Sequence, residues 1–205
     1  MTEQILSLAS LFVLSLATSI IPGPSNFLTM RTAMRHGRGP AVATAIGTAL
    51  GCLIWCVAAL VGLGALLAAA PWLYKTMRIA GGLYLIWFAI GLWRAKAEPA
   101  ADEPPPGAAR AAFWQGLAIC LTNPKSVLFF ASVFSAYVGP DTPDWVHYAA
   151  VALVTVTCLV WQAGLALALS AARAAQAYAR AQKPLDRGAA GLMGLFGLSL
   201  LWTSA

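Results

Sequence analysis

The chain has 205 residues, of which 60% are hydrophobic and only 10% are charged, and its mean hydropathy is +0.75. A soluble domain carries roughly 25% charged residues, and one core of this length could not bury so much apolar surface, which excludes an ordinary soluble protein. The net charge of +6 does not indicate a nucleic-acid partner either, because the basic residues lie at the ends of apolar segments.

Six apolar blocks predict an all-α membrane protein with six transmembrane helices, because most blocks reach the roughly 20 residues that cross a bilayer. They cover residues 5–30, 41–69, 72–93, 113–138, 146–170 and 188–202. The first block follows Glu3 and no basic residue, so we interpret it as a membrane helix and not as a cleavable signal peptide.

The first and fourth blocks each contain a predicted helix break, at Pro22-Gly23-Pro24 and at Asn123-Pro124. Proline has no N–H and clashes with the carbonyl four residues earlier. Freed carbonyls are tolerated in a membrane only beside protein or a water-filled cavity. Both breaks lie at a similar depth, roughly 10 Å and roughly 16 Å from the predicted cytoplasmic face.

We therefore expect a substrate site or pathway between the breaks, with kinks that serve only helix packing as the alternative. Lys125 is too deep to reach the membrane surface easily, and a central lysine costs at least ~2.5–3.5 kcal/mol. It could bind a substrate carboxylate, exchange a proton, or donate to carbonyls that a break frees. Gln162 could line a pathway or bond to a neighbouring helix. The candidate residues are Pro22, Gly23, Pro24, Ser25, Asn26, Thr122, Asn123, Pro124, Lys125 and Gln162.

Small residues also recur in the apolar blocks. Gly47 and Gly51 form a small-xxx-small pair, which predicts a close helix-packing face and offers a surface for a homodimer. The cysteines are interpreted as polarisable packing residues, because all of them lie in apolar blocks: Cys52, Cys56, Cys120 and Cys158.

A polar linker over residues 94–112 is predicted to lie in the cytoplasm and to divide the chain into halves, 1–93 and 113–205, with three helices each. An odd number of helices inverts the second half relative to the first, a common plan in secondary transporters. Ten of the thirteen Lys and Arg residues lie in the first, third and fifth loops. The positive-inside rule places these loops in the cytoplasm and both termini outside.

The chain resembles the LysE/RhtB family of amino-acid exporters over essentially its whole length. The residues that carry the resemblance are Pro22-Gly23-Pro24, the stretches 33–51 and 80–93, and above all residues 121–126 (LTNPKS) followed by Phe129-Phe130. The chain departs from the family where many relatives have an acid shortly before the tryptophan of the fifth helix. Here Cys158 precedes Trp161, and no acidic partner for a substrate ammonium is evident.

The resemblance implies efflux of amino acids or close derivatives, driven by the proton-motive force, through the bacterial cytoplasmic (inner) membrane. It implies a small-molecule substrate and a lipid environment, but no cofactor and no enzymatic reaction. A transmembrane thiol carrier is one alternative, because Cys120 lies near Pro124, although the first break has no cysteine and exchange needs two sulfurs. Metal-ion efflux is another, but the interiors of the membrane blocks offer it no carboxylate or imidazole ligand, since His147 lies at the start of its block.

Overall fold

The structure is a computed structural model that describes residues 2–20, 23–62, 105–130 and 142–171, with scattered positions between 72 and 94 and between 183 and 201. Every regular element in these residues is a helix, which confirms the all-α prediction. Three of the described helices are long and apolar enough to cross a membrane. The predicted third and sixth helices lie largely outside the described residues.

The first half contributes three described helices. α1 spans Thr2–Ile20, α2 spans Pro24–His36 and α3 spans Arg38–Leu60. Proline suits the first position of α2, where its missing N–H would have no partner within the helix. α2 and α3 are separated only by Gly37, which has a positive φ of 75° and donates its N–H to Ala33 O. Glycine adopts this conformation without steric cost, and it lets the chain turn directly into α3.

The second half contributes α6 (Ala108–Thr122), α7 (Pro124–Leu128) and α9 (Asp144–Leu169). α9 agrees closely with the predicted block 146–170. α6 starts at Ala108, inside the stretch predicted as linker. Four of its first five residues are alanines, which favour helix more strongly than any other residue, and the helix therefore starts before the long apolar run.

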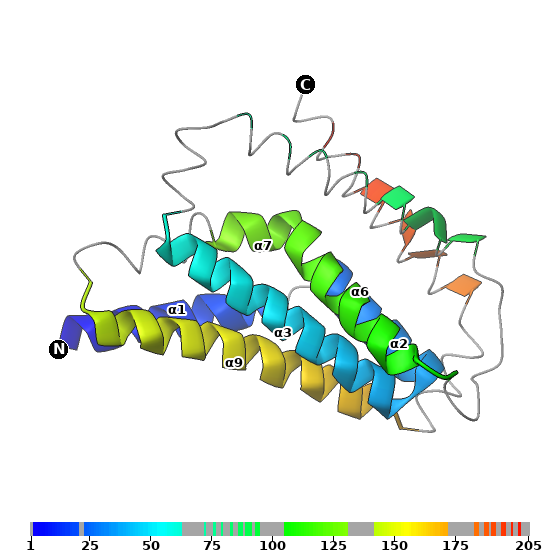
Figure 1. Ribbon diagram of the computed structural model, residues 1–205, viewed down its shortest axis with the longest axis horizontal. Coiled ribbons are helices and arrows are strands. Elements are labelled where there is room, and N and C mark those ends of the chain that lie inside the picture. The colour runs from blue at the N-terminus through cyan, green and yellow to red at the C-terminus, as the bar shows by residue number, and fades with distance from the viewer. Residues whose placement is uncertain are drawn as a thin grey trace.

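The helices form a bundle in which α3 is central. α3 packs against both α6 and α9, and α1 packs against α9. Figure 1 shows that α1 and α9 run in one direction while α3 and α6 run in the other. The main described cluster of buried apolar side chains joins α1, α3, α6, α7 and α9, and it includes Leu11, Trp55 and Cys120.

Glycines bring α3 and α6 into unusually close contact. A Cβ on Gly47 would collide with the backbone of Phe113, and one on Gly116 would collide with the backbone of Thr44. A Cβ on Gly51 would lie 2.7 Å from the Cβ of Cys120. The predicted packing face at Gly47 and Gly51 is thus confirmed, but α6 of the same chain covers it. This face is therefore not free to pack against a second copy. The homodimer stays a prediction, and the Gly47/Gly51 face does not supply its interface.

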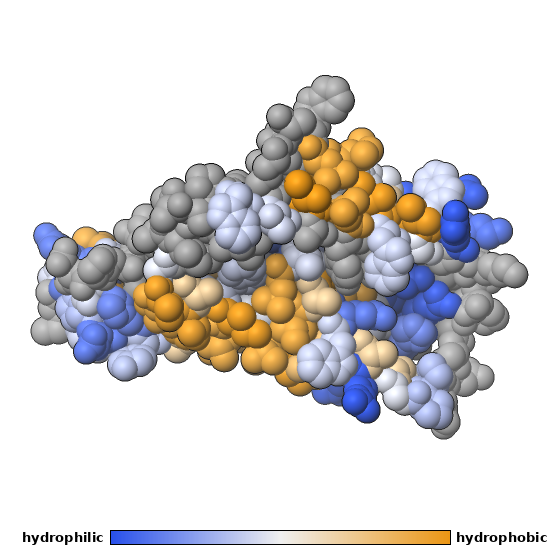
Figure 2. Space-filling view, turned by 45° about the horizontal axis from the view of Figure 1, so that its top comes forward, coloured by the Kyte–Doolittle hydropathy of each residue, from blue (hydrophilic) through white to orange (hydrophobic). Residues whose placement is uncertain are grey.

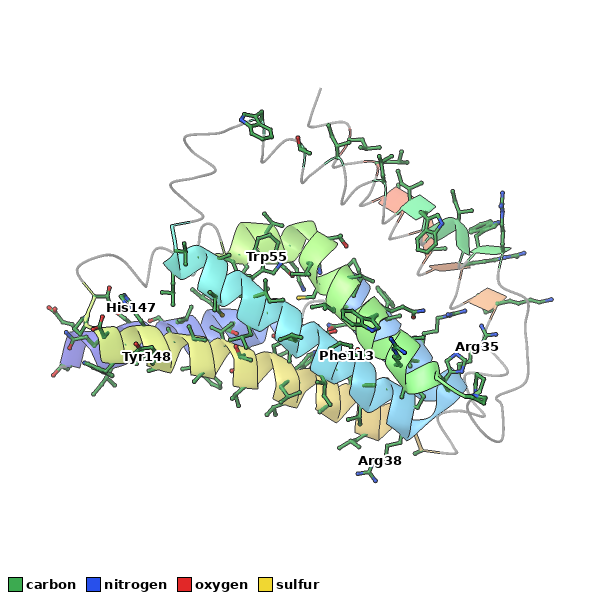
Figure 3. All side chains as sticks on the ribbon, in the orientation of Figure 1. Arg35, Arg38, Trp55, Phe113, His147 and Tyr148 are labelled. Atoms are coloured by element: carbon green, nitrogen blue, oxygen red, sulfur yellow. The ribbon has the colours of Figure 1, made fainter. Side chains whose placement is uncertain are left out.

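The surface is typical of a membrane protein. In Figure 2 apolar side chains run along the middle of the visible face, and the most hydrophilic residues lie toward its ends. Large exposed apolar residues include Ile54 and Val160, whose exposure is favourable only next to lipid or another apolar surface. Figure 3 shows Arg35 and Arg38 at the end of the bundle opposite to His147 and Tyr148.

Candidate functional site

The C-terminal end of α1 accepts side chains from two other helices. Because α1 ends at Ile20, the carbonyl oxygens of its last four residues have no partners within the helix. Lys125 Nζ donates to Thr18 O at 2.6 Å, and Asn26 Nδ2 donates to Ser19 O at 2.8 Å. A helix C-terminus carries partial negative charge, so the end of α1 favours the ammonium group.

The start of α7 supplies its own cap. Asn123 precedes the helix with an extended backbone, and its Oδ1 accepts a hydrogen bond from the backbone N of Lys125 at 3.0 Å. Pro124 takes the first helical position, where a missing N–H is no loss. The Asn-Pro pair therefore starts α7, and it fixes the point from which the Lys125 side chain reaches α1.

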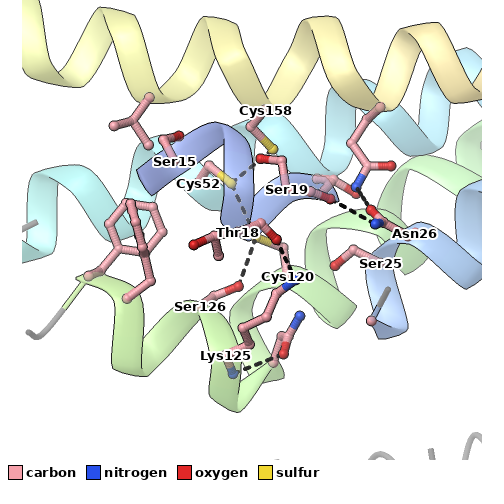
Figure 4. Close-up of a pocket in the computed structure, with 17 residues that line it drawn as sticks. Ser15, Thr18, Ser19, Ser25, Asn26, Cys52, Cys120, Lys125, Ser126 and Cys158 are labelled. Carbon is pink, nitrogen blue, oxygen red and sulfur yellow. Dashed lines mark hydrogen bonds between the residues drawn. The ribbon is translucent and has the colours of Figure 1, made fainter. Parts of the chain in front are cut away.

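A cavity of about 60 Å³ lies among these groups. One water needs ~10–15 Å³, so the cavity has room for several waters. Figure 4 shows the polar and thiol side chains that surround it. Among the described residues of its wall, Lys125 is the only charged residue and none is acidic. The wall consists of Ser15, Thr18, Ser19, Gly23, Ser25, Asn26, Thr48, Cys52, Cys120, Asn123, Lys125, Ser126, Phe129, Phe130, Val154, Cys158 and Gln162.

A chain of hydrogen bonds crosses the cavity wall from α1 through α2 to α9. Asn26 donates to Ser19 O, and Gln162 Nε2 donates to Asn26 Oδ1 at 3.0 Å. Both side chains are buried, at 7% and 4% exposure. Gln162 Oε1, at the far end of this chain, has no hydrogen-bond partner in the part of the protein that the structure describes.

Three thiols from three helices meet at the cavity wall. Cys52 Sγ of α3 lies 3.0 Å from Cys158 Sγ of α9 and 3.7 Å from Cys120 Sγ of α6 (Figure 4). All three cysteines are free and buried, and they belong to the main apolar cluster. The interpretation as packing residues agrees with this burial. No pattern in the sequence indicates that these sulfurs converge beside the polar groups.

The structure brings most of the predicted site residues together. The residues that line the cavity are Gly23, Ser25, Asn26, Asn123, Lys125 and Gln162. Pro24 is buried as the first residue of α2. Thr122 does not line the cavity, because its Oγ1 donates back to Ala118 O at 2.8 Å within α6. Pro22 and the side chain of Pro124 lie outside the described residues.

Sequence reasoning missed the small hydroxyl residues of α1 and α3. Thr18 and Ser19 lie three and four residues after Ser15, spacings that place both on the helix face of Ser15. Thr48 and Cys52 are likewise four residues apart. A polar face on an otherwise apolar membrane helix was the available signal, and such a face belongs in the bundle interior.

Comparison with known proteins identifies the family. Residues 16–204 match the family described as LysE type translocator. The uncharacterized membrane protein YahN of Escherichia coli K12 is 32% identical over 184 residues, which cover 88% of this chain and 82% of the relative. The threonine efflux protein of the same organism is 31% identical over 185 residues, covering 88% and 90% of the two chains.

A further relative is the homoserine/homoserine lactone efflux protein of Salmonella typhimurium, 32% identical over 139 residues, which cover 67% of this chain and 68% of the relative. No solved structure matches the chain. The family match spans nearly the whole sequence, and its relatives are membrane and efflux proteins, which confirms the resemblance drawn from the sequence motifs. The chain therefore belongs to the LysE type translocator family, and it is a multi-pass membrane protein of a transporter family.

Proposed function

We propose that this protein is a secondary transporter that exports a small amino acid or a close derivative from the cytoplasm. The observation that carries the proposal is the cavity itself, a small polar space that holds one described ammonium group within a bundle of apolar helices. The ammonium of Lys125 suits a substrate carboxylate, and the surrounding amides and hydroxyls suit its other polar groups. Relatives named threonine and homoserine efflux proteins support the same substrate class.

The transport pathway runs between two inverted halves of three helices each, with the first and fourth helices broken at proline. Support comes from the directions of α1 and α6, which are opposite in Figure 1. It also comes from the helix bounds, since α1 and α6 each end shortly before a helix that starts at a proline. In transporters of this plan, discontinuous helices at the repeat interface form the binding site.

The protein lies in the bacterial cytoplasmic membrane with both termini outside. Arg35 and Arg38 occupy one end of the bundle, and Asp144 begins α9 near the other end, beside His147 (Figure 3). Basic residues favour the cytoplasmic side. Export against a gradient requires an energy source, and the proton-motive force supplies it. Cysteine labelling at the two bundle ends in intact cells tests the orientation, and an uncoupler tests the driving force.

Counterflow of radiolabelled amino acids in proteoliposomes tests the function directly. The wild-type protein is expected to exchange at least one small neutral amino acid faster than protein-free liposomes and faster than Lys125→Ala. If folded wild-type protein exchanges none of the twenty amino acids, the proposal is wrong. If an imposed pH gradient leaves net export unchanged, the proposed proton coupling is wrong, but the proposed export of amino acids is not contradicted.

The thiol cluster gives the thiol-carrier alternative one specific observation. The first break lacks a cysteine, but Cys52 and Cys158 supply two sulfurs 3.0 Å apart at the cavity wall, and thiol exchange needs two. Replacing both cysteines by serine separates the functions. We expect the double variant to keep amino-acid counterflow, whereas a thiol carrier would lose all activity.

A further inference from the structure

The unpartnered oxygen of Gln162 marks a place in the cavity that lacks a hydrogen-bond donor. Gln162 lines the cavity, is only 4% exposed, and has no partner for Oε1 in the described part of the chain. A buried polar atom without a partner is costly, because it has lost its water and gained nothing in return. Such an atom indicates a water or a ligand group that supplies the missing proton.

The polarity of the hydrogen-bond chain decides which end of the Gln162 amide is open. Ser19 O is a backbone carbonyl, which accepts but does not donate. Asn26 must therefore turn its Nδ2 toward Ser19 and its Oδ1 toward Gln162, as the distances of 2.8 and 3.0 Å indicate. Gln162 must then donate through Nε2. Its open end is thus an acceptor oxygen, and the end of α1 sets this orientation.

We propose that Gln162 Oε1 accepts a hydrogen bond from the substrate's α-ammonium group and makes the site selective for small zwitterionic amino acids that carry no second ammonium group. The inference rests on the proposed function and assigns the polar group that faces the ammonium. The described cavity wall has no acid, so the acceptor that faces the ammonium group is a neutral amide oxygen.

The charge and size of the cavity narrow the substrate class. Lys125 is a cation in the wall and no described acid offsets it, so a second positive charge on the substrate, as in lysine or arginine, would be repelled. The volume of about 60 Å³ disfavours substrates with bulky side chains. The site therefore favours small zwitterions of no net charge.

A double-mutant cycle tests the assignment: the Gln162 amide is removed from the protein, and the ammonium group is removed from the ligand. Unlabelled competitors are added to counterflow of radiolabelled L-threonine or L-alanine, and each amino acid is compared with its analogue that lacks the ammonium group, 3-hydroxybutyrate or propionate. Wild-type protein is expected to prefer the amino acid at least ~10-fold, which corresponds to the loss of one charge-assisted hydrogen bond. In Gln162→Leu the preference should fall to within ~3-fold.

Two further variants separate ammonium recognition from a structural effect. Gln162→Glu keeps an acceptor oxygen but loses the donor to Asn26 Oδ1, so it should lower Tm and still retain the preference for the ammonium group. Thr155→Val is the matched control, because Thr155 Oγ1 is another buried side-chain oxygen of α9, yet Thr155 does not line the cavity. It should leave both counterflow and preference unchanged. Thermal unfolding of each variant verifies folding.

The outcomes are distinct. A wild-type protein that binds threonine and 3-hydroxybutyrate equally would overturn the inference even if Gln162→Leu does not fold. Folded Gln162→Leu with the full wild-type preference would also overturn it, while leaving amino-acid export intact. A wild-type protein that exchanges no amino acid would instead overturn the proposed function, and this inference with it.

Discussion

The two helix junctions of the bundle look alike in sequence but differ in how their ends are capped. At the α6–α7 junction, Asn123 caps the start of α7 with its own side chain, and Thr122 donates back into α6. At the α1–α2 junction, Gly23 offers no side-chain cap, and the carbonyls at the end of α1 depend on Asn26 and on Lys125 from the other half. Trp55 Nε1 of α3 also donates to Cys120 O in the last turn of α6, at 3.3 Å. The two junctions therefore differ in the cap of the second helix, which is a side chain at α7 and is absent at α2.

This difference separates residues that position the Lys125 side chain from residues that we expect to contact the substrate. The self-capped junction fixes the start of α7 and so directs a cation across the cavity. The junction that lacks its own cap borders the polar chain that ends at Gln162 Oε1. Because the polar chain with the unpartnered oxygen begins at the α1–α2 junction, we expect substrate contacts to matter most there. Changes at the α6–α7 junction should act mainly through stability, with Lys125 as the exception.

The largest effect is expected for Lys125→Ala, which removes the hydrogen bond from Lys125 Nζ to Thr18 O at the end of α1. A hydrogen bond to a charged group contributes ~1.5–3 kcal/mol, and its loss leaves Thr18 O with one donor fewer. We expect Tm to fall by several degrees and counterflow to fall to the level of protein-free liposomes. Lys125→Arg keeps a cation and should recover part of both. Normal transport by Lys125→Ala would mean that the cation serves neither role.

The next largest effect is expected for substitutions of Asn26, whose side chain connects Ser19 O to Gln162. Asn26→Leu leaves one acceptor and one donor without this partner, and we expect a loss of ~1–3 kcal/mol in stability together with strongly reduced counterflow. Asn26→Asp is the informative comparison, because a carboxylate accepts from Gln162 but does not donate to Ser19 O. We expect it to be as impaired as Asn26→Leu. Wild-type behaviour of Asn26→Asp would refute the orientation assigned to the chain.

A smaller effect is expected at the self-capped junction. Asn123→Ala removes the N-cap of α7, which costs ~1 kcal/mol, or about 2–4 °C in Tm for a chain of this size. Transport should fall by less than about tenfold, since a tenfold change requires ~1.4 kcal/mol. Asn123→Asp restores a capping oxygen and should restore stability. If Asn123→Ala abolishes transport without lowering Tm, Asn123 contacts the substrate directly.

Much of this arrangement could be predicted from the sequence. The apolar blocks gave the helical class, and the proline motifs together with Gln162 gave residues that do lie around one cavity. These predictions succeeded because polar groups in a membrane helix are costly and must face the bundle interior. The same reasoning applied to Ser15, Thr18 and Ser19 would have added the α1 face.

The partners of these residues could not be predicted. No acid in the membrane blocks of the sequence could pair with Lys125, and its acceptor is a backbone carbonyl of α1. Because every residue has a backbone carbonyl, no sequence pattern could reveal this acceptor. The convergence of Cys52, Cys120 and Cys158 depends on the close approach of α3 and α6 at Gly47, Gly51 and Gly116. Tertiary packing of this kind leaves only a small-residue pattern in the sequence.

The smallest effect is expected for Thr122→Val, which separates membership of the sequence motif from membership of the site. Thr122 stands directly before Asn123, but its hydroxyl donates to Ala118 O inside its own helix and does not line the cavity. Valine has nearly the same shape, and the Ala118 carbonyl remains available to the helix. We expect stability to change by ~0.5 kcal/mol or less and counterflow to match wild type. A large loss of transport with unchanged Tm would place the whole Thr-Asn-Pro-Lys motif at the substrate, and the contrast between the two junctions would then be wrong.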